Sequence, residues 1–517
     1  MLPKLSTNKT AKEPEVVWEP IPGSSQELAI DTRCHHTLYH GARGPGKTIT
    51  QLMRYRRRVG LGYGSFWRGV IFDREFKHLS DLVAQSKRFF TQFGDGAVFH
   101  ASGQDYKWVW PTGEELLFRH IKKVSDYDSY HGHEYPFVGF NELTKYPTGE
   151  IYEKMMSVNR SSFVPEKHTP KDDKGRYLTP DGKPLPDIPL EVFSTTNPNG
   201  PGHNWVKRKF IDVAKPGEVV RTEVEVFNPR TQRNETVVKT QVAIFGSFRE
   251  NIYLPPEYVA DLESITDPNL RRAWLYGDWS VVSGGIFDDL WSPKIHVLPR
   301  FTIPKEWVID RSFDWGSSHP FSVGWWAEAN GEEVTLPNGD RFAPAPGSLI
   351  QIAEWYGAKE IGSNRGMRLS APDIAKGIME REVELLREGW IAAQPIPGPA
   401  DNQIRDVREA DTDTIESKML AEGIRWTVSD KSPGSRKNGV QLFRDRMEAA
   451  VRGEGPGIYF MINCQASIQL IPNLPRDNEK PDDVDTDAED HTWDMVRYRL
   501  LKKAKRMAKN ITVRFPL

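Results

Sequence analysis

The stretch GARGPGKT, Gly41 to Thr48, constrains the fold more than any other feature of this chain. It follows the short apolar run TLYH and precedes ITQLMRYRRRV, so that a strand, a glycine-rich loop and a helix are expected in succession. Glycines let backbone N–H groups turn inward around phosphates at the positive end of a helix. A lysine then reaches the β- and γ-phosphates, and a hydroxyl contacts magnesium. The predicted nucleotide contacts in this loop are Gly41, Gly44, Gly46, Lys47 and Thr48.

A glutamine precedes the loop in IPGSSQELAI. The amide of Gln26 offers a donor and an acceptor together, which suits the two hydrogen-bonding edges of adenine. A surface glutamine at the start of a helix is an equally good interpretation.

The run FVGFNEL, Phe137 to Leu143, is the second motif. An apolar strand that ends in two acids is expected beside the magnesium ion of a nucleotide-driven motor. Here Glu142 stands where a general base would polarise the attacking water. Asn141 replaces the first acid, and its amide oxygen can still accept a hydrogen bond from a magnesium-bound water. The alternative is an ordinary buried strand that leaves the core.

Strands and helices alternate along the first half of the chain, which predicts a doubly wound α/β core. The last strand, LEVFSTTNPNG, is expected to lie between the phosphate-loop strand and the acidic strand. Thr196 and Asn197 could then sense the γ-phosphate, although a capped turn before Pro198 explains the same residues. The Pro-, Lys- and Asp-rich stretch of residues 164–189 is predicted to be a surface insertion.

The second half follows the order of a ribonuclease H-like fold. Asp314 ends the first predicted strand, Asp401 ends a later parallel strand, and Asp490 and Asp494 lie one turn apart on a final helix predicted over EDHTWDMVRYRLLKKAKR. Such acids together hold two magnesium or manganese ions about 4 Å apart for the hydrolysis of a phosphodiester. Singly, each aspartate is more often a turn former.

Composition restricts the class of protein. A chain of 517 residues is expected to form several domains, and two cysteines do not make a disulfide framework, which is typical of a reducing cytoplasm. No apolar run is long enough to span a membrane, and the N-terminus lacks the apolar core of a secretory signal.

The net charge of −2 gives no global electrostatic reason for binding nucleic acid. The closing stretch LLKKAKRMAKNITVR is locally basic, and it is expected to bind DNA or a partner, or to be a solvated helix end.

Taken together, the motifs resemble the large terminase subunit of tailed bacteriophages. Besides the motifs above, YGDW at Tyr276–Trp279, PGPAD with Asp401, and DHTWDMVRY with Asp490, His491 and Asp494 carry the resemblance, which spans roughly residues 26–500. It implies an N-terminal P-loop (RecA/ASCE-like) ATPase with ATP and Mg²⁺, which moves double-stranded DNA into a procapsid. It also implies a C-terminal nuclease with two Mg²⁺ or Mn²⁺ ions, which cuts concatemeric DNA.

The resemblance implies partners and further site residues as well. The family acts as a ring, usually of five copies, on the portal protein, is supplied by a small terminase subunit, and works in the host cytoplasm. Arg43 would contact the γ-phosphate, and Arg160 would serve as an arginine finger to a neighbouring subunit or remain a surface arginine. Asn141 departs from the usual aspartate. Asp494 matches the family motif best among the acids of the last helix, with Asp490 or His491 assisting.

The predicted domains are an ATPase over residues 1–245, a helical linker over 246–300, a nuclease over 301–500 and a basic tail over 501–517. Two rival classes share parts of this pattern. A helicase or DNA-repair ATPase would have the phosphate loop but would not explain acids in nuclease order. A capsid- or portal-associated scaffold that merely binds nucleotide would need no catalytic acids.

Overall fold

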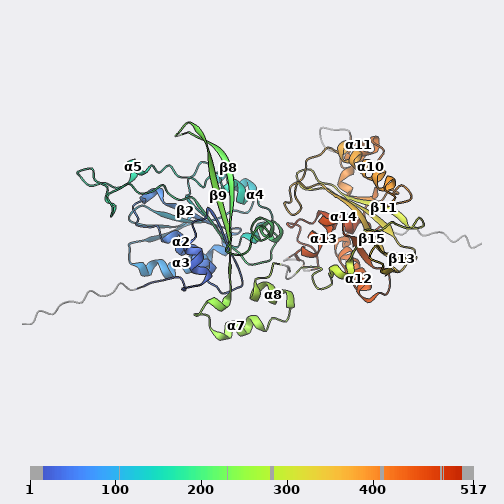
Figure 1. Ribbon diagram of the computed structural model, residues 1–517, viewed down its shortest axis with the longest axis horizontal. Helices are drawn as coiled ribbons and strands as arrows, with labels where there is room; N and C mark the ends of the chain where they lie inside the picture. The colour runs from blue at the N-terminus through green and yellow to red at the C-terminus, as the bar shows by residue number, and fades with distance from the viewer. Residues whose placement is uncertain are drawn as a thin grey trace, which may run out of the picture. The chain divides into compact units, whose positions relative to one another are not determined.

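The computed structural model describes residues 16–103, 105–229, 231–279, 285–407, 413–477, 480 and 482–502. Contacts between residues divide the chain into two units. The first comprises residues 1–198, 209–266 and 271–278, and the second comprises residues 199–208, 267–270 and 279–517. Each unit is an α/β structure built around its own sheet (Figure 1), as the alternation of strand and helix patterns predicts.

The first unit contains a nine-stranded sheet in the order β3-β4-β5-β2-β6-β7-β1-β9-β8. Neighbouring strands in the run β5-β2-β6-β7-β1-β9 pair in parallel. The pairs β3-β4, β4-β5 and β8-β9 are antiparallel. β7 separates the phosphate-loop strand β1 from the acidic strand β6, so this prediction is confirmed. The strands are β1 His36–Gly41, β2 Arg68–Asp73, β3 Val98–Ser102, β4 Asp105–Val109, β5 Glu115–His120, β6 Phe137–Phe140, β7 Glu191–Thr195, β8 Val219–Asn228 and β9 Arg233–Gly246.

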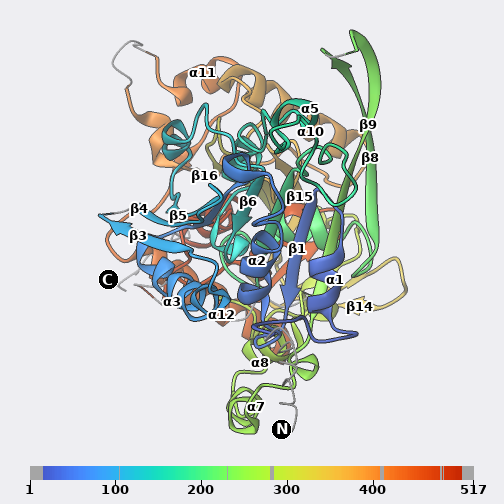
Figure 2. The ribbon, with the colours of Figure 1, turned by 90° about the vertical axis from the view of Figure 1, so that its left-hand side faces the viewer.

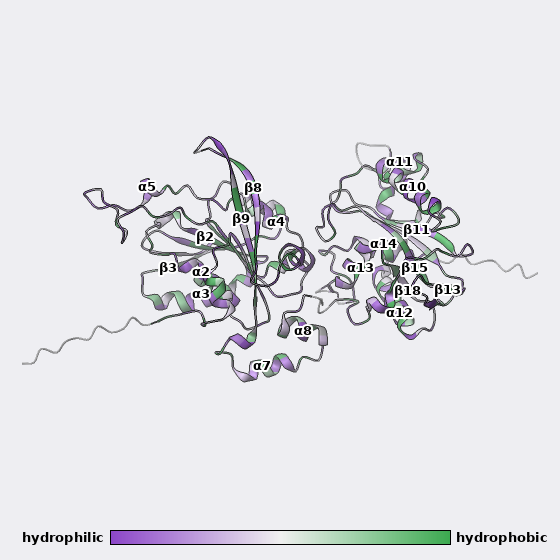
Figure 3. Ribbon diagram, viewed as in Figure 1, coloured by the Kyte–Doolittle hydropathy of each residue, from purple (hydrophilic) through white to green (hydrophobic). Residues whose placement is uncertain are grey.

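Continuous apolar runs become the centre of this sheet because both of its faces are covered. Every residue of β6 and β7 is buried, and Figure 3 shows apolar residues gathered along the central strands. The β8–β9 hairpin is different, since most of its residues are exposed and it runs on beyond the neighbouring strands (Figure 2). This hairpin was not predicted, although the alternating pattern of RTEVEV is visible in the sequence.

Helices flank the first sheet, and helix α1 begins where the Ser24 hydroxyl accepts a hydrogen bond from the Gln26 N–H. The helices of this unit and of the connector after it are α1 Ser25–Asp31, α2 Lys47–Arg56, α3 Leu79–Phe90, α4 Glu150–Met155, α5 Pro165–His168, α7 Pro256–Glu263 and α8 Pro268–Tyr276, with short turns at Gly64–Phe66, Phe76–His78, Thr91–Phe93, Val124–Ser129, Leu143–Lys145, Lys207–Ile211 and Phe248–Glu250.

The second unit contains a seven-stranded sheet in the order β10-β18-β15-β12-β11-β16-β17. β12 is antiparallel to both neighbours, whereas β16 and β17 run parallel to β11, which is the ribonuclease H-like arrangement that the sequence predicts. β10 and β18 were not predicted. The strands are β10 Val297–Leu298, β11 Val308–Asp314, β12 Ser322–Glu328, β13 Val334–Thr335, β14 Arg341–Phe342, β15 Leu349–Tyr356, β16 Pro399–Ala400, β17 Thr427–Val428 and β18 Ile458–Met461, with β13 and β14 forming a separate pair.

Side chains on the two faces of this sheet enter different cores, since successive residues of a strand point to opposite sides. Trp325 packs in one core with Ile374 and Ile378 of α10, and Trp326 packs in the other with Phe443 and Trp493. The helices are α6 His203–Val206, α9 Pro293–His296, α10 Ala371–Arg387, α11 Ile415–Ala421, α12 Ser435–Arg452, α13 Gln465–Leu470 and α14 His491–Leu500, with short turns at Asn402–Arg405 and Ile471–Asn473.

The last helix ends at Leu500, so the part of the predicted final helix beyond Lys502, together with most of the predicted basic tail, lies outside the described residues. Among the helices that are described, none combines the length and the apolar character that crossing a membrane would require.

Candidate functional sites

The phosphate loop joins β1 to α2 and has an unusual backbone. Gly41, Gly44 and Gly46 have φ values of 125°, 97° and 85°, which side chains other than glycine rarely adopt. At Gly41 a Cβ atom would also lie 2.4 Å from the Gly246 carbonyl oxygen on the neighbouring strand. Turn conformations of this kind point backbone N–H groups into a concavity that can bind an anion, so these glycines are required by the geometry of the loop.

Lys47 begins helix α2 and is only 6% exposed. Its ammonium group donates a hydrogen bond of 2.6 Å to the Ala42 carbonyl oxygen within the loop. Burial lowers the pKa of Lys47 to about 8, while the nearby Glu142 carboxylate acts in the opposite direction. The charge of this buried ammonium is only partly compensated by the Glu142 carboxylate, so the site favours an anionic ligand. Thr48 follows in the first turn of α2 and is partly exposed.

The ends of β6 and β7 lie beside the loop. The Asn197 amide donates a 2.7 Å hydrogen bond to the Gly41 carbonyl, and the Asn197 backbone N–H donates to Glu142 Oε2 at 3.3 Å. Glu142 itself has a φ of 55°, in the left-handed region that favours glycine. Thr196 bonds to the Thr144 hydroxyl at 2.8 Å. The structure therefore brings Lys47, Glu142 and Asn197 together, as the sequence predicts.

Gln26 lies against the phosphate loop, and its side chain is buried. Its Nε2 donates to the Pro45 carbonyl oxygen at 2.8 Å, and its Oε1 accepts from the Ile21 N–H at 3.4 Å. In this arrangement the amide supports the loop through contacts within the protein. The predicted contact with adenine stays a prediction.

Two arginines have partners within the protein. The guanidinium of Arg43 stacks on the Trp274 ring, 3.4 Å from its centroid, and the Arg43 N–H donates to the Trp274 carbonyl at 2.7 Å. Arg160 is half exposed and donates to the carbonyl oxygens of Gly132, at 2.8 Å, and His133, at 3.3 Å.

Residues after β9 that were not predicted to belong to the site also hold the loop. Asn251 Nδ2 donates to the Gly44 carbonyl oxygen at 2.6 Å. Gly277, within the YGDW motif, has a φ of 62°, and a Cβ atom there would lie 2.7 Å from the backbone of Gly41. YGDW was noted as a motif, but its packing against the phosphate loop could not be read from the sequence.

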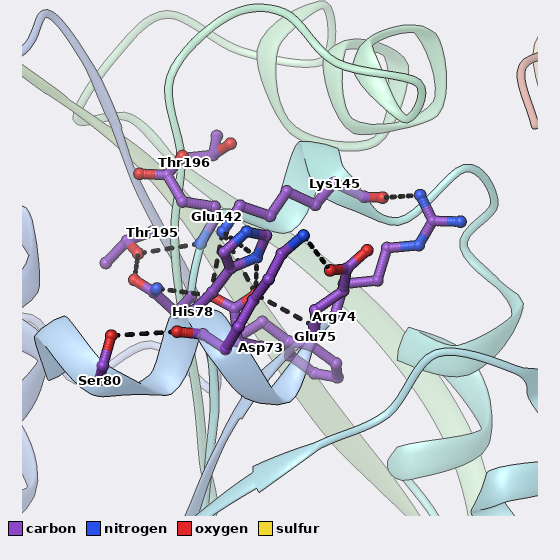
Figure 4. A network of polar contacts seen from close by, with 12 residues as sticks. Asp73, Arg74, Glu75, His78, Ser80, Glu142, Lys145, Thr195 and Thr196 are labelled. Carbon is purple, nitrogen blue, oxygen red and sulfur yellow. Dashed lines mark hydrogen bonds and ion pairs between the residues drawn. The ribbon is translucent and has the colours of Figure 1, made fainter. Parts of the chain in front are cut away.

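A polar network at the end of β2 was missed as well (Figure 4). Asp73 is fully buried, and its carboxylate accepts from Asn141 Nδ2 at 2.8 Å and from the Lys145 ammonium at 3.0 Å. The only sequence signal is that Asp73 ends the apolar strand RGVIFD, which neighbours the acidic strand.

The acidic site of the second unit forms where two parallel strands end beside a helix. Asp314 ends β11 and Asp401 follows β16, and the Asp401 N–H bonds to the Phe313 carbonyl at 2.9 Å. The Tyr498 hydroxyl of α14 lies 3.4 Å from both Asp314 Oδ1 and Asp494 Oδ2. The three aspartates that the sequence singled out thus come from separate elements to one place.

Burial and mutual repulsion change the titration of these acids. The pKa of Asp314 is raised well above its usual value by burial and by the neighbouring carboxylates of Asp494 and Asp401. The pKa of Asp490, which precedes α14, is raised to about 8 by burial and by Asp494. The site therefore holds more negative charge than its surroundings can easily stabilise.

Basic and polar side chains that were not predicted contact the acids. Lys431 forms an ion pair with Asp401, and Arg497 forms one of 3.0 Å with Asp494. Arg436 lies 3.7 Å from Asp490 and 3.8 Å from Asp494. Arg497 lies within the DHTWDMVRY motif, whereas Lys431 and Arg436 follow no recognisable motif. His491 lies 3.2 Å from Asp314 Oδ2 and 3.1 Å from Asn364 Oδ1, so of the two residues expected to assist, His491 contacts Asp314 directly.

The donor set suits a hard divalent cation. Asp314, Asp401 and Asp494 offer carboxylate oxygens, the ligands that magnesium and manganese prefer, and a cation would relieve the repulsion that raises the pKa of Asp314. Within the described part of the chain, no three His, Cys, Asp or Glu side chains are already arranged to hold one ion. The predicted two-ion site stays a prediction.

The fold and both sites define a two-part α/β protein that joins a phosphate-loop unit to a ribonuclease H-like unit with an acidic site. No family model and no curated protein matches the chain. Among solved structures, it is similar to large terminases of bacteriophages.

The large terminase of a thermophilic bacteriophage, in complex with ADP, is 14% identical with a TM-score of 0.36, and the match covers 92% of this chain and 97% of that chain. The bacteriophage HK97 large terminase is 9% identical with a TM-score of 0.41 and 92% coverage of both chains. The P22 large terminase nuclease domain is 12% identical with a TM-score of 0.30, covering 42% of this chain and 92% of that one. Because these identities and TM-scores are low, the function proposed below rests on the residues of this chain.

Proposed function

We propose that this chain is a large terminase subunit, which uses ATP to move double-stranded DNA into a procapsid and cuts concatemeric DNA with a metal-dependent nuclease. The observation that carries the proposal is the presence, in one chain, of a phosphate loop beside Glu142 and of three converging aspartates on a ribonuclease H-like sheet. A helicase or a repair ATPase would account for the first site alone.

In the ATPase, Lys47 would offset the charge of the transferred phosphoryl group, and Glu142 would orient and polarise the attacking water. Asn197 contacts both Gly41 and Glu142, and it therefore couples the phosphate loop to the base. Mg²⁺ would neutralise charge on the phosphates, held through Thr48 and through a water on Asn141. Arg43 would reach the γ-phosphate after leaving the ring of Trp274.

In the nuclease, Asp314, Asp401 and Asp494 would hold Mg²⁺ or Mn²⁺, with Asp490 assisting. Two such ions would lower the pKa of water and stabilise the leaving oxygen of a phosphodiester. His491 and Tyr498 position the Asp314 carboxylate by their contacts with its two oxygens. Lys431 would leave Asp401 as a cation binds, because both compete for the same carboxylate.

The proposal includes partners. The chain would act in the host cytoplasm as a ring, of about five copies by the resemblance, docked on the portal protein and supplied by the small terminase subunit. Arg160 is half exposed, although its guanidinium contacts the loop at Gly132 and His133. It is therefore available to act as an arginine finger toward a neighbouring copy.

Two assays on one preparation test the proposal. Purified protein should convert supercoiled plasmid to nicked or linear DNA with Mn²⁺ and without ATP, and it should hydrolyse ATP with Mg²⁺. Protein that hydrolyses ATP and never cuts DNA would favour the helicase or repair class.

We expect Gly277→Ala to weaken nucleotide binding. An alanine at φ 62° is strained, and its Cβ would press on the backbone of Gly41 at 2.7 Å. Strain of this kind costs about 1 kcal/mol or more in unfolding free energy. Affinity for a fluorescent ATP analogue and the unfolding temperature measure the two effects. The matched control is Gly217→Ala, with a φ of 83° and no atom within 4 Å of the added Cβ, which should lose stability but keep its affinity.

The basic tail is best tested by truncation after Lys502. Lys502 pairs with the buried carboxylate of Asp310 at 2.5 Å, so a cut after Leu501 would also remove a structural contact. Truncation after Lys502 should leave ATP hydrolysis and the unfolding temperature unchanged while reducing DNA packaging into procapsids. Normal packaging by this protein would show that the tail has no role in it.

A further inference from the structure

The segment that follows β6 and carries Glu142 lacks the acid expected before it, yet a buried carboxylate lies beside Asn141. Asp73 ends β2, which pairs in parallel with β6, and its side chain is 0% exposed. Asn141 Nδ2 donates to Asp73 Oδ2 at 2.8 Å. The negative charge that β6 lacks is therefore present one strand away.

The contact also fixes which way the amide of Asn141 points. An ionised carboxylate accepts hydrogen bonds and donates none, so the nitrogen of the amide must face Asp73. The oxygen then faces β7, where the Thr195 hydroxyl donates to Asn141 Oδ1 at 3.3 Å. That hydroxyl accepts in turn from the Glu142 N–H at 3.4 Å. Asp73 thus orients the Asn141 amide so that the oxygen of that amide lies on the side of the proposed base.

The same carboxylate holds the segment after Glu142. The Lys145 ammonium lies 3.2 and 3.0 Å from the two oxygens of Asp73, and His78 Nδ1 lies 3.3 Å from Oδ1 (Figure 4). Asp73 therefore bonds to residues on both sides of Glu142, whose backbone is in the left-handed region. A buried charge with such contacts orders its neighbours, because losing it would leave their polar groups unpaired.

We propose that Asp73 is a positioning residue of the ATPase. It holds the Asn141 amide with its oxygen available to a magnesium-bound water, and it supplies from β2 the negative charge that aspartate usually provides on β6. This inference rests on the proposed ATP hydrolysis. It predicts that aspartate and asparagine can be exchanged between positions 73 and 141. Aspartate at both positions should impair hydrolysis.

Three variants test the exchange: Asn141→Asp, Asp73→Asn, and the double variant with both changes. Asn141→Asp places two carboxylates in contact, and we expect hydrolysis to fall about tenfold or more, because like charges this close do not both ionise. Asp73→Asn keeps an acceptor for Asn141 but loses the charge, and it should raise the Mg²⁺ concentration needed for half-maximal hydrolysis several-fold. The double variant restores an acid–amide pair, so it should recover most of the rate lost by Asn141→Asp.

A readout independent of activity is the unfolding temperature without nucleotide, which Asn141→Asp should lower and the second change should restore. The control is Glu75→Gln, which removes a carboxylate paired with Lys77 and Lys122 and should leave the Mg²⁺ dependence unchanged. A double variant no better than Asn141→Asp in either readout, or an Asp73→Asn protein with wild-type Mg²⁺ dependence, would overturn the inference. Wild-type protein that hydrolyses no ATP would instead overturn the proposed function.

Discussion

Asp401→Ala is expected to end the cutting of supercoiled plasmid while ATP hydrolysis stays close to the wild-type rate. Asp401 is one of three aspartates that converge from β11, β16 and α14, and each would face a divalent cation. Removing one ligand weakens cation binding and misplaces the activated water, so cleavage should fall by several orders of magnitude, as expected when both ions are needed. Agarose-gel conversion of plasmid with Mn²⁺ measures the loss.

The structure suggests a second variant and a control. The Asp401 side chain also accepts from the Gln403 N–H at 3.0 Å, so alanine removes a local cap as well as a charge. Asp401→Asn keeps that acceptor and should still lose cleavage. Asp289→Asn, an exposed acid of the same unit paired with Arg444, should cut normally. Cleavage at the wild-type rate by both Asp401 variants would mean that this unit is not the proposed nuclease.

Lys47→Ala and Glu142→Gln should stop ATP hydrolysis and leave Mn²⁺-dependent cutting intact. Lys47 is a buried ammonium held within the phosphate loop, and contacts of this type contribute a factor on the order of 10² or more in rate. Glu142→Gln is nearly isosteric and can still accept from the Asn197 N–H, so its loss would report on the charge of the base. Phosphate release with saturating Mg²⁺ and ATP measures both.

Lys154→Ala, at an exposed ion pair with Glu150, is the control for Lys47→Ala. Retained plasmid cleavage in each ATPase variant shows that the second unit is folded, and an unfolding temperature close to that of the wild type shows that the first unit is folded as well. Hydrolysis within a few-fold of wild type in Lys47→Ala would rule out the phosphate loop as the catalytic site.

Much of the fold could be predicted because its signals are local. The glycines of the phosphate loop occupy backbone conformations that exclude other residues, and FVGF is apolar at every position because both faces of its strand are covered. In the second half, Asp314 at the end of β11 and Asp494 on α14 lie where the order of the acids predicts. The hairpin of β8 and β9 was missed because its exposed residues carry no continuous apolar pattern.

By itself, the sequence determined which residues have the chemistry for phosphate and cation binding: Lys47, Glu142 and the aspartates at strand ends. Only the tertiary structure decided what stands beside them. Asp73 lies against Asn141 because β2 and β6 are neighbours in the sheet, and Lys431 lies on Asp401 through a loop that no motif marks. Strand order and the pairing of charges depend on contacts between residues far apart in the chain, and local patterns of apolar and polar residues do not specify these contacts.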